Sequence, residues 1–172
     1  ICSSRQQLPS YTPPNIRIFR DLDMNGAMSC IRHACANLIL VKDDERGAGH
    51  ITAVAGMHLG TPQIVSSVEV LSDYFINHYN CIKVPVGADA ATRHAVEKLL
   101  QYSSLTQQLV ANGRNYAAKW LTHEAATQRM FRAIDRVFRE EKTQEADPEW
   151  LAFMGSFSEI HSDGRESASE SI

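Results

Sequence analysis

Short, mostly apolar runs separated by amphipathic stretches occupy the first half of the chain. After a Pro-Pro pair, apolar and polar residues alternate, which predicts a strand over residues 15–20. A short apolar run predicts a strand over residues 38–41, and further strands are expected over residues 63–66 and 80–85. An apolar run such as residues 38–41 is typical of a parallel strand that is buried on both faces, and residues 63–66 are expected to be buried as well.

The segments between these predicted strands show helical periodicity. Apolar residues three and four apart predict a helix over residues 25–37, and a second helix over residues 51–59 is expected to end at Gly60. A short helix is expected over residues 70–78. Strands that alternate with helices indicate an α/β fold, in which a Rossmann-like parallel sheet is flanked by helices and joined by right-handed crossovers.

From Asp89 onward the pattern is helical throughout, so a helical C-terminal part follows the sheet. Asp89 is expected to cap one helix, and Thr122 is expected to cap the last long one. Ser104 and Gln107 fit a capping box between them. Core packing is the interpretation for Tyr116, Trp120, Phe138, Cys30 and Cys35.

The length of 172 residues is enough for one domain with a sizeable core. We divide the chain into a Rossmann-like domain over residues 1–141, a helical extension over residues 142–160 and a tail over residues 161–172. The Ser and Glu content of the tail predicts disorder. Because the sequence begins with Ile1 and not with Met, we interpret it as part of a longer polypeptide.

Charge and composition narrow the classes of function. A net charge of −3 argues against a basic nucleic-acid surface. No apolar run approaches the roughly 20 residues that a transmembrane helix needs, and no secretory signal is visible. The four cysteines lack metal-ligand spacing, so a reduced, cytoplasmic setting is expected.

A glycine-rich turn, GAGHIT, covers residues 47–52 between a predicted strand and a predicted helix. Free N–H groups at the helix start, together with the helix dipole, make such a turn an anion site. The turn follows Val41 at the carboxyl edge of the sheet, where parallel sheets bind ligands, and the loop after Phe19 is expected at the same edge. The alternative is a plain tight turn, with Thr52 as helix cap and His50 as a surface histidine.

Three carboxylates, Asp43, Asp44 and Glu45, precede the turn. They could bind a divalent cation, form the acidic cluster of a phospho-receiver domain, or lie in solvent as an acidic loop. A receiver domain needs a later strand-end Asp and Lys, and Pro-Val-Gly at residues 85–87 stands there instead. The chain contains no G-x-G-x-x-G, Gly-Lys-Ser/Thr or G-x-S-x-G motif, which argues against dehydrogenases, P-loop NTPases and nucleophile-elbow hydrolases.

Three segments in a fixed order carry a family resemblance. They are GAGHITAVAGMHLGTPQIVSS at residues 47–67, SDYFINHYNCIKVPVGADA at residues 72–90 and LVANGRNYAAKWLTHEAATQRM at residues 109–130. The set resembles the C-terminal, donor-binding half of GT-B glycosyltransferases of the group-1 type, over roughly residues 1–138. The resemblance implies one half of a GT-B fold, transfer of a hexose-like sugar from a nucleoside-diphosphate sugar, and neither a cofactor nor an active-site metal. It also implies an acceptor-binding domain before Ile1 and an acceptor that the sequence does not identify.

The resemblance also assigns residues. It places six around the donor's diphosphate: Gly47, Ala48, Gly49, His50, Ile51 and Thr52. Glu45 corresponds to the acidic residue that faces the donor sugar, and His50 is a candidate to act near the same sugar, so both are taken as catalytic. Phe19 and Arg20 match the loop beside the nucleobase.

Two positions depart from the family's pattern. Ala55 stands where the family usually carries a Glu that binds the ribose, and Cys81 stands where Gly is common. Alanine has no side-chain acceptor for a hydroxyl group. Ala55 thus favours the alternative of a non-catalytic nucleotide- or sugar-binding, or regulatory, module with the same fold. In either case we expect the 172-residue chain alone to show no transferase turnover.

Overall fold

The computed structural model describes residues 13–19, 22–42, 49–138, 148–149, 151–153 and 155–156. The chain forms two compact units, Ile1–Ala117 and Ala118–Ile172. The predicted boundary at residue 141 and the predicted tail from residue 161 lie outside the described residues.

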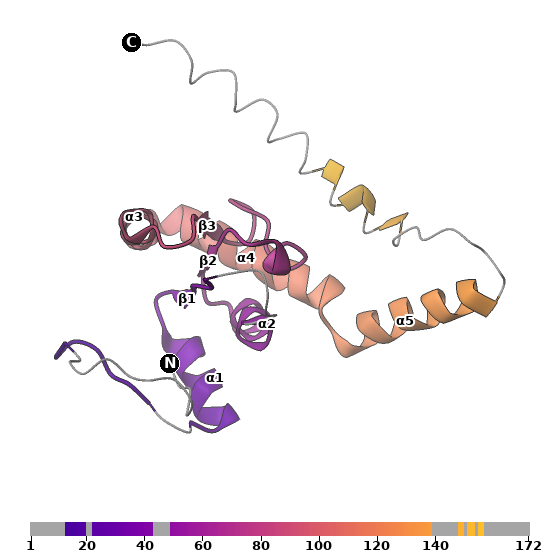
Figure 1. Cartoon of the computed structure of the whole chain (residues 1–172), viewed down its shortest axis with the longest axis horizontal. Coiled ribbons are helices and arrows are strands. Elements are labelled where there is room, and N and C mark those ends of the chain that lie inside the picture. The colour runs from indigo at the N-terminus through magenta and orange to yellow at the C-terminus, as the bar shows by residue number, and fades with distance from the viewer. Residues whose placement is uncertain are drawn as a thin grey trace, which may run out of the picture. The chain divides into compact units, whose positions relative to one another are not determined.

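A parallel three-stranded sheet lies at the centre of the first unit (Figure 1). Its strands are β1 (Asn37–Ile39), β2 (Gln63–Ser66) and β3 (Ile82–Val84), in the spatial order β1-β2-β3. Leu38 of β1 pairs with Ile64 of β2. The predicted α/β class with a parallel sheet is confirmed, and β2 has the predicted bounds.

Helices lie on both sides of this sheet. They are α1 (Met24–His33), α2 (His50–Leu59), α3 (Asp89–Gln101) and α4 (Ser103–Trp120), with a short 3-10 helix at Glu69–Leu71. Figure 1 shows α2 and α3 on opposite sides of the strands, where both pack directly on the sheet, and α1 packs beside α2. The helix predicted over residues 51–59 is confirmed as α2, which ends where Gly60 adopts a left-handed conformation. Only the part of α4 up to Ala117 belongs to the first unit.

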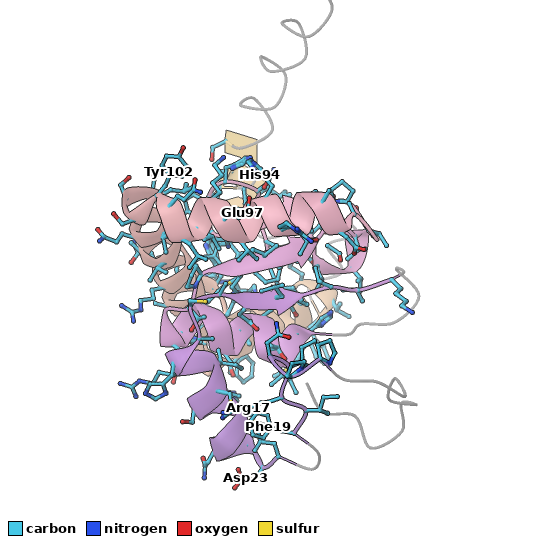
Figure 2. All side chains as sticks on the ribbon, turned by 90° about the vertical axis from the view of Figure 1, so that its left-hand side faces the viewer. Arg17, Phe19, Asp23, His94, Glu97 and Tyr102 are labelled. Atoms are coloured by element: carbon cyan, nitrogen blue, oxygen red, sulfur yellow. The ribbon has the colours of Figure 1, made fainter. Side chains whose placement is uncertain are left out.

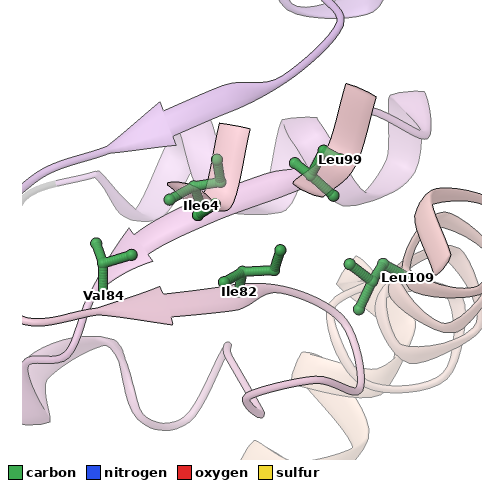
Figure 3. Close-up of a cluster of buried hydrophobic side chains, with 6 residues drawn as sticks. Ile64, Ile82, Val84, Leu99 and Leu109 are labelled. Atoms are coloured by element: carbon green, nitrogen blue, oxygen red, sulfur yellow. The ribbon is translucent and has the colours of Figure 1, made fainter. Parts of the chain in front are cut away.

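The core on the α3 side of the sheet is apolar (Figure 3). Its buried members are Ile64, Ile82 and Val84 from the sheet, Ala95 and Leu99 from α3, and Leu109 from α4. Burying one such large aliphatic side chain contributes about 1.5–3 kcal/mol relative to leaving it exposed. These contacts fix α3 and the first part of α4 against β2 and β3.

Two side-chain amides connect the other face of the sheet to α2. Asn37 Nδ2 donates to Gln63 Oε1 at 3.0 Å, and Gln63 Nε2 donates to the carbonyl of Ala53 at 2.9 Å. A Cβ atom at Gly56 would lie 2.8 Å from Cδ of Gln63, so α2 can approach the sheet this closely only with glycine there. The buried amide of Gln63 is thereby satisfied, as buried polar groups generally are, and α2 is held on β1 and β2.

Three local predictions are wrong. Residues 13–19 form a turn and irregular chain, because among the described residues no strand pairs with this alternating segment, and a strand is stable only when paired. The helix expected over residues 70–78 is reduced to the 3-10 turn at Glu69–Leu71 and the turns that follow. Asp89 is the first residue of α3, and Ala88 takes the cap position without a side-chain bond.

Two further predictions are wrong: the burial of Cys30 and Cys35, and the role of Ser104 as a helix cap. α1 buries none of its residues, and both Cys30 and the nearby Cys35 are exposed, so their predicted core role is wrong. Apolar periodicity marks a helix face without showing how much of that face a neighbour covers. Ser104 is not a cap because α4 begins before it, with the N–H of Thr106 donating to the carbonyl of Tyr102 at 3.1 Å.

The second unit contains the end of α4 and the helix α5 (His123–Phe138). The N–H of Ala125 donates to Oγ1 of Thr122 at 3.1 Å, which confirms the predicted cap. Trp120 is buried as predicted, whereas α5 buries none of its residues and Phe138 is 82% exposed, so its predicted core role is wrong. Within the described part of the chain, every helix is too short or too polar to span a bilayer.

Candidate functional site

The predicted anion site falls at the start of α2. Gly49 caps this helix with a left-handed φ of 88° and offers no side chain. Its carbonyl accepts the first helical hydrogen bond, from the N–H of Ala53 at 2.8 Å. The N–H groups of His50, Ile51 and Thr52 precede that bond, so helix geometry directs them out of the helix end. Thr52 is the third residue of α2, and its interpretation as the helix cap is wrong.

Gly49 lies in close contact with the end of β1. A Cβ atom at Gly49 would lie only 2.6 Å from Cγ2 of Ile39, the last residue of β1. This close approach, combined with the left-handed φ, explains glycine at position 49. Because β1, β2 and β3 are parallel, the start of α2 lies at the carboxyl edge of the sheet, where ligands of parallel sheets bind.

Hydrogen bonds tie the strand ends together at this edge. The N–H of Val41, which follows β1, donates to Oγ of Ser66 at the end of β2 at 3.0 Å. The N–H of Ser67 donates to the carbonyl of Val84, the last residue of β3, at 2.8 Å. Ser66 is buried and Ser67 is exposed. The three strand ends are therefore held together at the carboxyl edge of the sheet.

His50 has unusual surroundings for a residue at a helix start. The centroid of its ring lies 4.9 Å from that of Tyr74, with an angle of 43° between the ring planes. Its Nε2 atom is buried and has no hydrogen-bond partner among the residues that the structure describes. Since buried polar atoms are nearly always paired, Nε2 is an atom for which a ligand oxygen would be a suitable partner.

The other predicted site residues either lie away from the strand ends or fall outside the described residues. Phe19 is 43% exposed and lies in the irregular segment near Asp23, at the start of α1 (Figure 2). It therefore does not follow a strand of the sheet. The structure brings together Gly49, His50, Ile51 and Thr52. Outside the described residues lie Arg20, Asp43, Asp44, Glu45, Gly47 and Ala48, whose roles stay predictions. Within the described ranges, no group of three or more His, Cys, Asp or Glu side chains could hold a metal ion.

The two departures from the family's pattern lie in the first unit. Ala55 is part of α2 and is half-buried. Cys81 is fully buried, and its thiol donates a long hydrogen bond to the carbonyl of Ile76 at 3.6 Å. Burial raises the pKa of the Cys81 thiol to about 12, and the positive charge of Lys83 offsets only part of this effect. A thiol with so high a pKa stays protonated and unreactive at neutral pH.

The comparisons with known proteins define the fold. No family model and no curated protein matches the chain. Among solved structures, the chain is similar to part of sucrose-phosphate synthase from Thermosynechococcus elongatus, with a TM-score of 0.54 and 23% sequence identity. The match covers 62% of this chain and 26% of that one, so the chain corresponds to about a quarter of its length. At this identity the match shows the fold alone, and it confirms the predicted fold of one half of a GT-B protein.

Proposed function

We propose that the chain is the donor domain of a glycosyltransferase and binds the diphosphate of a nucleoside-diphosphate sugar at the start of α2. One observation carries the proposal. Three main-chain N–H groups, at residues 50–52, point out of the start of α2. The left-handed Gly49 allows this helix start to lie against the carboxyl edge of the parallel sheet. Such an end attracts anions through its free donors and through the helix dipole. The GT-B-like fold supports a nucleotide-sugar as the particular anion.

The chemistry follows from where negative charge develops. When the bond between the sugar and the diphosphate breaks, charge accumulates on the departing phosphate oxygens. Fixed N–H donors at residues 50–52 would stabilise that charge without reorganising, which is often the largest contribution to catalysis. Glu45 would orient the sugar hydroxyls, and Phe19 and Arg20 would flank the nucleobase. A separate domain would supply the site for the acceptor, and the proposal does not specify which molecule the acceptor is.

A second function remains open because of one residue. Ala55 stands where the resemblance implies a Glu that holds the ribose, and alanine cannot accept a hydrogen bond from a hydroxyl group. A binding or regulatory module would retain nucleotide affinity without transfer. Sugar transfer by a chain joined to its acceptor domain would distinguish the enzyme from the module, whereas nucleotide binding alone is common to both.

The test of the site uses UDP and GDP as probes of the 172-residue chain. A nucleotide that prefers the folded state raises the melting temperature, and a concentration of 100 times Kd stabilises by about 2.7 kcal/mol. Ile51→Pro removes one N–H from the second position of α2, where the first turn of a helix tolerates proline. Loss of a hydrogen bond to a charged group costs about 1.5–3 kcal/mol, so Kd should rise at least tenfold.

Ala90→Pro is the matched control, because Ala90 is the second residue of α3 and is exposed. It introduces the same backbone change at another helix start, and we expect it to leave Kd unchanged. If neither UDP nor GDP raises the melting temperature of the unmodified chain, the donor-domain proposal is wrong. If UDP binds but Ile51→Pro and Ala90→Pro affect Kd equally, the start of α2 is not the diphosphate site.

A further inference from the structure

We propose that Tyr74 is a positioning residue of the donor site, whose ring holds the His50 imidazole so that Nε2 donates a hydrogen bond to a phosphate oxygen of the bound nucleotide. The inference rests on the proposed function and adds to it a residue that no motif assigns. Its basis is the contact between the two rings, whose centroids lie 4.9 Å apart, and the buried Nε2 atom that has no partner within the described residues.

The loop that carries Tyr74 is held by its neighbours. Asn80, which is buried, donates from Nδ2 to the carbonyl of Tyr74 at 2.9 Å and accepts through Oδ1 from the N–H of Ile76 at 2.9 Å. The hydroxyl of Tyr116, a buried residue of α4, donates to the carbonyl of Asp73. The backbone on both sides of the Tyr74 side chain is therefore fixed from inside the first unit, and its ring is a stable support.

Support for the ring of His50 also limits its orientation. A histidine at a helix start can adopt several side-chain rotamers, and a free imidazole would lose entropy on binding a ligand. Contact with an aromatic ring at 43° stabilises one of them. In that orientation Nε2 is covered by neighbouring atoms and is unpaired among the described residues, which costs free energy, so the covering atoms must give way when a phosphate oxygen reaches it. A phosphate oxygen held by the neighbouring N–H groups at residues 50–52 is an acceptor of the required charge.

The experiment compares substitutions of Tyr74 with one remote tyrosine. Tyr74→Leu removes the aromatic contact, and Tyr74→Phe keeps the ring. Tyr102→Leu is the control, because Tyr102 is exposed at the end of α3 on the other side of the sheet (Figure 2). We expect Tyr74→Leu to raise Kd for UDP about tenfold, the equivalent of ~1.4 kcal/mol. Tyr74→Phe and Tyr102→Leu should stay within about twofold, below 0.5 kcal/mol on the same scale.

A double-variant cycle tests whether Tyr74 acts through His50. If it does, His50→Gln weakens UDP binding, and adding Tyr74→Leu to it causes little further loss. His94→Gln is the control for the first substitution, since His94 lies on the exposed side of α3 (Figure 2). Losses that simply add would overturn the positioning role, and so would a Tyr74→Phe variant as weak as Tyr74→Leu.

A measurement on the unmodified chain avoids dependence on variants that fail to fold. The ¹⁵N resonance of His50 Nε2 should shift when UDP is added and should not shift when uridine is added. If UDP binds and this resonance does not move, the inference about Tyr74 and His50 is wrong while the proposed function stands. If UDP does not bind at all, the proposed function is wrong and the inference falls with it.

Discussion

Replacing Gly49 with alanine tests the geometry on which the site depends. The residue has a φ of 88°, and adopting a left-handed conformation costs an L-residue about 1–2 kcal/mol. The new Cβ would lie 2.6 Å from Cγ2 of Ile39, which is only 6% exposed. The branched side chain of Ile39 has little freedom to withdraw, so overpacking should add about 1–3 kcal/mol. The sum is a loss of about 2–5 kcal/mol, a large part of the 5–15 kcal/mol that stabilises a typical domain.

Gly87→Ala provides the matched control for this loss. Gly87 has a φ of 72°, but a Cβ atom there would meet nothing within 4 Å. Only the conformational cost of about 1–2 kcal/mol should therefore apply. Urea unfolding followed by far-UV circular dichroism measures both variants, with unchanged m-values required for the comparison. If Gly49→Ala loses no more stability than Gly87→Ala, the close approach between the turn and β1 is not present in solution.

Two further predictions concern the thiol of Cys81 and the cap of α5. Burial raises the pKa of Cys81 from 9.0 to about 12, so the unfolded chain loses this proton first and stability should fall as pH rises from about 9 to 12. Urea midpoints measured over this range should decline less in Cys81→Ala than in the exposed control Cys30→Ala, and equal declines would contradict this origin. Thr122→Ala removes the acceptor for the N–H of Ala125 and should weaken α5 by about 0.5–2 kcal/mol. Thr127→Ala, inside the same helix, should not weaken it, and a difference in helical circular dichroism between the two variants checks this.

The sequence alone predicts the order of the three strands but not all of their bounds, since the apolar run over residues 38–41 forms β1 at Asn37–Ile39 and the strand expected over residues 80–85 is shortened to Ile82–Val84. Residues 63–66 form β2 with the expected bounds, and α2 ends at Gly60 as expected, because local composition and a left-handed glycine decide both features. The alternation of apolar and polar residues over 15–20 wrongly predicts a strand. A strand requires a pairing partner, and pairing is not a local property of the sequence. Phe138 and Cys30 mislead for a related reason, because burial depends on what covers a helix face.

The candidate site also has some features that the sequence predicts and others that it does not. The glycine turn and the helix start at His50 are visible in the sequence, because left-handed glycine and helix onset are local features. The contact between His50 and Tyr74 is not visible, since it joins the start of α2 to a loop beyond β2 and depends on how Asn80 and Tyr116 hold that loop. No spacing rule connects these positions, so only the three-dimensional structure could reveal them.

Backbone amide resonances give the most direct measurement of the central claim. In a titration of the ¹⁵N-labelled chain with UDP, the amides of His50, Ile51 and Thr52 should move downfield together and report one Kd, because their N–H groups gain charged acceptors. Uridine, which lacks phosphate, should leave them in place. If UDP binds while these three amides stay unmoved, or if UDP does not bind, main-chain donors at the start of α2 do not hold a diphosphate.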